Sequence, residues 1–163
     1  MASTLKLTME ELYEDEYQLI AIHTSLEDYR LAYFLNQSLS IQLKKCEDDL
    51  HVQSKKGESR FSRFEFEDED LCNSWNLIEN RIHITNIESE IATDLFSSNS
   101  SSFTTNAFLL PEFKNVDFIL KIDQEIERDE LSQYISKMNA IEKITMVYAI
   151  DNQKIKTKNN LIF

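Results

Sequence analysis

Glycine and proline are almost absent from this chain. Its 163 residues include one of each, Gly57 and Pro111. The phosphate-binding loops of nucleotide-binding proteins depend on several closely spaced glycines, so a single glycine excludes both the Walker loop and the Rossmann fingerprint. The same shortage excludes collagen-like and proline-rich sequences.

Cysteines and long apolar runs are also scarce. Cys46 and Cys72 are the only cysteines, and they lack both the close spacing of a redox motif and the density of a disulfide-built secreted domain. No stretch approaches the roughly 20 apolar residues that cross a bilayer, and the N-terminus lacks the order of a signal peptide. We therefore expect reduced thiols, a cytoplasmic location and no membrane association.

Positive charge is in short supply. The chain has 17 Lys and Arg against 29 Asp and Glu, which gives a formal net charge of −12. Nucleic acids and anionic membranes are bound through Lys and Arg, so this charge predicts that neither is a partner. A protein is the expected partner, and an acidic surface favours a basic one.

Acidic residues are concentrated near the N-terminus, where residues 10–16 include five carboxylates. We interpret residues 1–16 as an acidic N-terminal arm. Residues 17–163 are the size of one ordinary domain, long enough to bury a core without disulfides or metals.

The chain contains two segments with the pattern of strand, helix and strand. Residues 17–24 form an apolar run that predicts a central strand, and a helix with one apolar face is expected to follow, with Ser25 as its N-cap. Residues 116–123 predict a second strong strand, residues 129–139 a second helix, and residues 144–150 a further strand.

Several shorter strands are expected between these units, without intervening helices. Residues 41–45 and 50–53 suggest a hairpin, residues 61–66 end in an alternation of aromatic and charged residues, and strand character returns at residues 75–78 and 81–84. This order predicts an α+β fold with a mostly antiparallel sheet and two main helices packed on one face. An elaborated ferredoxin-like arrangement is one concrete version.

The candidate catalytic and metal-binding patterns are weak. His23, Ser25 and Asp28 have the residue types of a nucleophilic triad, but a helix cap is the simpler role for Ser25 because nothing indicates an oriented base or an oxyanion site. The acidic residues 65–70 lack the calcium-loop pattern and fit a solvated strand edge better. Histidines and cysteines show no zinc spacing. We expect no catalytic centre, metal or cofactor.

Residues 110–118 read LPEFKNVDF, which resembles the motif that names the bacterial IPExxxVDY family. The motif positions that match are Pro111, Glu112, Val116 and Asp117. Leu110 replaces the first Ile of the motif and Phe118 replaces its final Tyr, which deletes one hydroxyl. Residues 22–36 and the closing NLIF also resemble the family, so the similarity spans nearly the whole chain. The family has no established activity, so the resemblance implies membership of the family and does not imply a function.

The motif itself predicts a short turn between two strands, because Pro111 ends one strand and Val116 begins the next. Alternation along the second strand is expected to place Val116 and Phe118 on one face and Asp117 on the other. Glu112 is expected to accept N–H bonds within the turn, and Asp117 to pair across strands. The alternative is that the two carboxylates receive a cationic group from a partner. Pro111, Glu112 and Asp117 are therefore candidates for a partner-binding or a structural role.

The leading hypothesis is a non-enzymatic protein-interaction or regulatory module that binds another protein through a sheet face or its acidic surface. The first alternative is a hydrolase or metal-dependent enzyme that uses Glu112 and Asp117, together with His23. The second is a structural subunit that stabilises a partner and exposes a large apolar patch when isolated.

Overall fold

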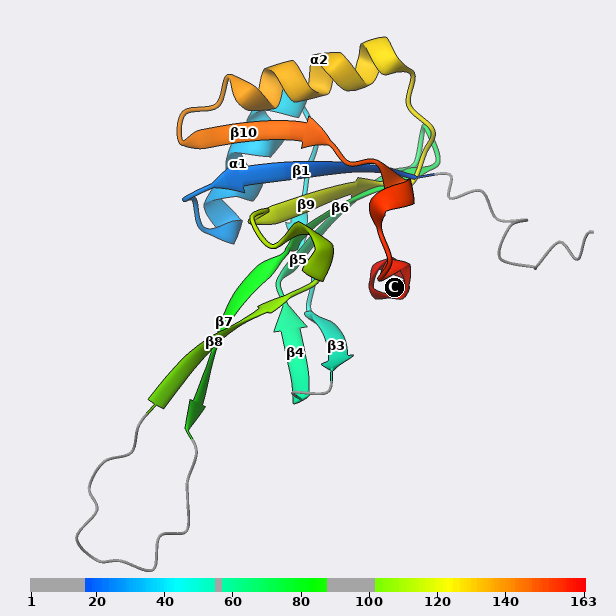
Figure 1. Cartoon of the computed structure of the whole chain (residues 1–163). Helices are drawn as coiled ribbons and strands as arrows, with labels where there is room; N and C mark the ends of the chain where they lie inside the picture. Colours follow the sequence, from blue (N-terminus) through cyan, green and yellow to red (C-terminus); the bar gives the residue numbers. More distant parts are fainter. Residues whose placement is uncertain (1–16, 55–56, 88–101) are drawn as a thin grey trace, which may run out of the picture.

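The computed structural model describes residues 17–54, 57–87 and 102–163 (Figure 1). The expected acidic arm at residues 1–16 lies outside the described residues.

One sheet organises the described chain, and all of its strand pairings are antiparallel. Its strands follow the order β10-β1-β9-β6-β5-β2. Their bounds are β1 (Gln18–Thr24), β2 (Lys44–Lys45), β5 (Arg63–Asp68), β6 (Asn73–Glu79), β9 (Phe118–Ile122) and β10 (Ile144–Ala149). The prediction of an α+β fold with a mostly antiparallel sheet is confirmed.

Two helices of the described chain, α1 (Asp28–Leu39) and α2 (Arg128–Asn139), connect strands of this sheet. Helix α1 follows β1, and α2 joins β9 to β10. With these helices, the spatial order β10-β1-β9-β6 reproduces the arrangement of a ferredoxin-like fold. The elaboration consists of β2 to β5, inserted before β6, and of the β7–β8 ribbon, inserted before β9.

The sheet has an apolar core on each face. On one face, residues such as Ile22 and Leu120 pack against both helices, which contribute Leu31, Leu35 and Met138. This confirms that the two helices lie on one face. On the other face, the cover consists of the LPEFKNVDF turn and the C-terminal segment, with buried residues Leu110, Val116, Ile155 and Leu161.

Val116 does not continue the row of Phe118, as strand alternation predicted. Phe118 packs on the helix face, whereas Val116 packs with Ile119 on the opposite face. The reason is that β9 begins only at Phe118, so Val116 still belongs to the turn and is not bound by the two-residue period of a strand.

Two pairs of strands stand outside the main sheet. Strands β3 (Leu50–Ser54) and β4 (Gly57–Phe61) form one pair, and β7 (Arg81–Ile87) and β8 (Ser102–Phe108) form the other. Figure 1 shows the β7–β8 ribbon extending away from the sheet. The expected hairpin of residues 41–53 is wrong, because β2 pairs with β5 whereas β3 pairs with β4. Gly57 begins β4 with φ 118°, a conformation that favours glycine.

The start of α1 also differs from the expectation that Ser25 caps it. The helix begins at Asp28 with Glu27 as N-cap, and no side chain caps it. The hydroxyl of Thr24 accepts the Leu26 N–H at 3.1 Å and donates to the Lys143 carbonyl at 2.8 Å. Thr24 therefore organises the loop between β1 and α1, one residue before the serine that the sequence suggested.

Candidate functional site

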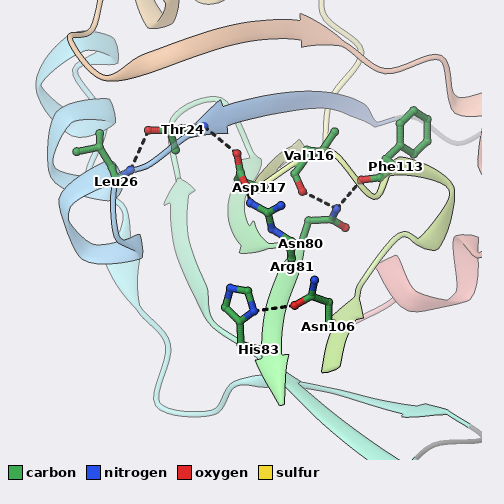
Figure 2. A network of polar contacts seen from close by, with 9 residues as sticks. All are labelled: Thr24, Leu26, Asn80, Arg81, His83, Asn106, Phe113, Val116 and Asp117. Atoms are coloured by element: carbon green, nitrogen blue, oxygen red, sulfur yellow. Dashed lines mark hydrogen bonds and ion pairs between the residues drawn. The ribbon is translucent and has the colours of Figure 1, made fainter. Parts of the chain in front are cut away.

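The LPEFKNVDF turn is built around Asn80, a fully buried residue between β6 and β7. Its Oδ1 accepts the Leu110 N–H at 2.8 Å. Its Nδ2 donates to the carbonyls of Phe113 and Val116, both at 2.9 Å (Figure 2). Its backbone N–H donates to the Asp117 carbonyl at 2.8 Å. Asn80 thus fixes the shape of the turn. The sequence analysis missed it, although an amide within the run of strand residues 75–84 was a usable signal.

Pro111 and Glu112 shape the first half of the turn. Pro111 opens a 3-10 helix, Pro111–Phe113, where a missing N–H costs nothing. The Glu112 carboxylate accepts the N–H groups of Lys156 and Thr157, each at 2.8 Å, and the Thr157 hydroxyl at 2.9 Å. These bonds reach the C-terminal segment, whereas we expected partners within the turn. Burial raises the pKa of Glu112, but the hydrogen bonds outweigh it and hold the pKa below 4.5.

Asp117 closes the second half of the turn. Its Oδ2 accepts the Thr24 N–H at 3.0 Å, and its Oδ1 forms an ion pair with Arg81 (Figure 2). The side chain is 17% exposed. Asp117 therefore ties the end of β1 to the start of β7. Because Glu112 holds the C-terminal segment and Asp117 holds β1 and β7, the structure does not bring the two carboxylates to a common partner.

A cleft of about 540 Å³ opens beside Asp117, between the loop before α1, the end of β6 and the start of β7. We call it the α1 cleft. Its ionisable side chains are Glu27, Asp28, Glu79, Asp117, Arg81 and His83. Arg81 is committed to Asp117, and the Nδ1 atom of His83 lies 2.7 Å from the Asn106 Oδ1 atom (Figure 2). Carboxylates therefore remain in excess in this cleft.

Glu79 is the least satisfied of these carboxylates. Burial raises its pKa, and the nearby Asp28 carboxylate raises it further, while Lys45 and His83 act in the opposite direction. Within the described chain, no hydrogen bond or ion pair engages the Glu79 carboxylate. By contrast, Asp28 accepts the Ser62 hydroxyl. A half-buried carboxylate without a partner is costly, so Glu79 provides an acceptor for an incoming cation.

Exposed aromatic side chains stand next to the α1 cleft. Tyr29 lines the cleft and is 59% exposed, and Tyr33, one helical turn further along α1, is 58% exposed. Phe34 packs edge-on against Tyr33, with ring centroids 5.6 Å apart. The outer face of α1 therefore carries an aromatic surface that is continuous with an acidic cleft.

No protein-family model matches the chain, and no curated protein matches it either. In the described part of the chain, no helix is both long and apolar enough to span a membrane. The geometry of the described residues is therefore the basis for any functional proposal.

The other sequence candidates are not assembled into a reactive centre. The Nε2 atom of His23 lies 3.4 Å from the Tyr148 hydroxyl, whereas Asp28 is bonded to Ser62, so no triad forms with Ser25. Among the residues that the structure describes, no group of three or more His, Cys, Asp or Glu side chains is arranged to hold a metal ion. Both cysteines are free thiols, Cys46 buried and Cys72 exposed.

Proposed function

We propose that this chain is a protein-interaction module that binds a basic segment of another protein at the α1 cleft. The observation that carries the proposal is the Glu79 carboxylate, half-buried and unpaired within the described chain, beside Asp28 in an acidic cleft. A Lys or Arg side chain that entered the cleft would supply the missing donor and would offset the repulsion between the two carboxylates.

The aromatic surface of α1 supports a protein as the partner. Tyrosine is enriched at the energetic centres of protein interfaces, because its ring buries a large area while its hydroxyl keeps a hydrogen bond. Tyr29 lines the cleft, and Tyr33 is exposed one helical turn further along α1. A cation over the Tyr29 ring would gain a further electrostatic attraction on its way to Glu79.

The roles proposed for the motif residues are structural. Pro111, Glu112 and Asp117 are each engaged by the chain itself, and this supports a turn that holds β1, β7 and the C-terminal segment together. The alternative of an enzyme that uses Glu112 and Asp117 lacks the shared site that acid–base cooperation needs. We therefore favour a non-enzymatic role, in a cytoplasmic member of the IPExxxVDY family.

The test is co-purification of partners from native lysate, followed by binding measurements with the partner that is recovered. We expect the double variant Asp28→Asn/Glu79→Gln to weaken binding at least about tenfold, because it removes the negative charge of both neighbouring carboxylates from the cleft. The matched control is Glu67→Gln/Glu69→Gln, which removes two charges from the end of β5 and the β5–β6 turn, outside the α1 cleft, and should bind as the unmodified chain does. Equal binding by both variants would contradict the proposal.

A further inference from the structure

The two strand pairs that stand outside the main sheet form a cleft between them. Strands β3 and β4 provide one wall, β7 and β8 provide the other, and Pro111 of the LPEFKNVDF turn also lines it. The cleft has a volume of about 250 Å³, and Figure 1 shows both strand pairs below the main sheet. We call it the ribbon cleft. It shares no lining residue with the α1 cleft.

The walls of the ribbon cleft are largely apolar. Val52 and Phe61 line it from β3 and β4, and Ile84 and Ala107 line it from β7 and β8. The strand registers and the two-residue period place each of these pairs of side chains on one face of its strand pair. Phe61 is fully buried, and Val52 and Ile84 are half-buried. The cleft is therefore recessed between two apolar faces.

Ser59 is the residue that indicates a ligand. It lines the cleft from β4 and is only 5% exposed, and its hydroxyl forms no hydrogen bond within the described chain. In that part of the chain, only the amide oxygens of Asn73 and Asn152 lack both a partner and accessible surface, so the Ser59 hydroxyl is accessible. Thr105 adds a second unpaired hydroxyl, half-buried, from β8. A polar group of a bound molecule would satisfy a hydroxyl that the chain leaves unpaired.

The lining favours a neutral molecule. Glu58 is the only ionisable lining residue in the described chain, and its carboxylate is already paired with His51. An anion in the cleft would lose its hydration without meeting a positive charge, and a cation would find no free carboxylate. An apolar cavity of about 150 Å³ is large enough for benzene, so this cleft has room for one single or fused ring. The rings of Phe61 and Phe108 in the lining favour an aromatic one.

We propose that the ribbon cleft binds a small neutral aromatic molecule with one hydroxyl or N–H group, of the class of phenols and indoles. Its ring packs between the apolar walls, and its polar group donates to the Ser59 hydroxyl oxygen. A tyrosine or tryptophan side chain of a peptide offers the same chemistry from another source. The free molecule is favoured because the cleft is recessed and holds one ring, whereas the exposed tyrosines typical of a protein interface lie on α1.

The experiment is an NMR titration of the isotope-labelled, full-length chain with indole. We expect saturable one-to-one binding, with the shifts concentrated on β3, β4, β7 and β8. Indole-3-acetate and tryptamine, which carry a charge, should bind at least about tenfold more weakly. The analogue 1-methylindole, which lacks the N–H donor, should bind at least about fivefold more weakly. A tripeptide with a central tryptophan tests the peptide source and should bind more weakly than indole.

Two variants test the site itself. Ser59→Ala should weaken indole at least about fivefold and leave 1-methylindole within about twofold, without lowering the melting temperature, because the hydroxyl has no partner in the described chain. Ala107→Phe fills the cleft and should abolish saturable binding. Its matched control is Thr104→Phe, at an exposed position on the other face of β8, which should stay within about twofold of the unmodified chain.

Several outcomes would overturn the proposal: no saturable indole binding, equal effects of Ala107→Phe and Thr104→Phe, equally tight binding of the charged analogues, or tighter binding of the tripeptide than of indole. A Ser59→Ala variant that weakened indole and 1-methylindole equally would also contradict it. These results are independent of the α1 cleft, whose variants are scored on a protein partner.

Discussion

Asparagine side chains form hydrogen bonds with backbone N–H and carbonyl groups at several turns and strand edges of this fold. Asn80 satisfies three backbone groups of the LPEFKNVDF turn. Asn36 pairs with both the N–H and the carbonyl of Leu43, and Asn139 does the same for Val147. An asparagine amide carries the same donor and acceptor as a peptide group, so it replaces a neighbouring strand where one is missing.

Asn80→Ala should destabilise the chain more than Asn36→Ala or Asn139→Ala. It leaves one N–H and two carbonyls unpaired in a buried place, so we expect the free energy of unfolding to fall by about 3 kcal/mol. Urea unfolding followed by circular dichroism measures this. Asn106→Ala, at an exposed position of β8, is the control and should cost less than about 0.5 kcal/mol. A similar loss for both variants would refute the role of Asn80.

Glu112→Gln tests the bond between the turn and the C-terminal segment. A carboxylate whose pKa is lowered on folding contributes stability above its unfolded pKa, and that contribution is lost as the pH falls through the folded pKa. At pH 7 we expect the variant to lose about 1 kcal/mol, a modest value because solvent screens the site.

The difference between the unmodified chain and Glu112→Gln should shrink as the pH falls below 4.5, the usual pKa of glutamate. Urea unfolding midpoints of both proteins, measured at pH 7, 5, 4 and 3, give this difference in stability as a function of pH. A difference that grew toward low pH would mean that the hydrogen bonds do not favour the charged carboxylate.

The sequence identified the residues of the turn better than it identified their partners. Glu112 and Asp117 were selected as candidates for a partner-binding or a structural role, and both carboxylates are bonded to the chain. Their partners lie far away in the sequence, at Thr157 and at Thr24, and no local pattern encodes such pairings. Asn80 was missed because an asparagine between two strands is typical of a turn, although its place within the apolar run of residues 75–84 was a usable signal.

At the scale of elements, the shortage of glycine forces other residues into left-handed backbone conformations. Ser40, at the C-terminal end of α1, has φ 57°, and Cys72 and Lys143 have φ 51° and 71°. Helices frequently end on a left-handed residue, and glycine adopts this conformation without steric cost. These positions are therefore points where the fold retains strain.

Ser40→Gly should stabilise the chain, because the relief of strain exceeds the added freedom of glycine in the unfolded state. We expect a gain of about 0.5–1 kcal/mol in the free energy of unfolding. Ser136→Gly, inside the C-terminal half of α2, is the matched control and should lose a similar amount, since glycine weakens a helix interior. Thermal denaturation of both variants measures these changes in stability. Destabilisation by Ser40→Gly would contradict the interpretation that Ser40 is strained.

The long periodic elements were predictable, and the short polar strands were not. Strands β1, β9 and β10 and both helices were expected from their apolar periods, because burial on a fixed face imposes those periods. The region of β2 to β4 was assigned to the wrong hairpin. Its strands are short and mostly exposed, so few buried positions distinguish one pairing from another.

At the scale of the whole molecule, the C-terminal segment covers the face of the sheet on which neither α1 nor α2 packs. Ile155 and Leu161 are 5% and 3% exposed and cover the face of the sheet opposite the helices. Asn160 fastens this segment through a 2.7 Å bond from its Nδ2 to the Leu109 carbonyl. The segment is therefore part of the core although it contains only short 3-10 turns.

Leu161→Ala should destabilise the molecule by about 2–5 kcal/mol, the range for removing a buried leucine side chain. The adjacent Ile162 is 78% exposed, so Ile162→Ala is a control of nearly equal chemistry and should cost less than about 0.5 kcal/mol. Urea unfolding of the two variants compares them directly. Equal effects would mean that the segment does not cover the second face.

We assign the protein partner to the α1 cleft, where carboxylates are in excess. The most direct measurement is photo-crosslinking in native lysate, with a benzophenone amino acid at Tyr29 or, as control, at Ile162. We predict one discrete adduct from position 29, which disappears with Asp28→Asn/Glu79→Gln and is absent from position 162. Adducts that form equally at both positions, or that survive removal of the two carboxylates, would contradict binding at the α1 cleft.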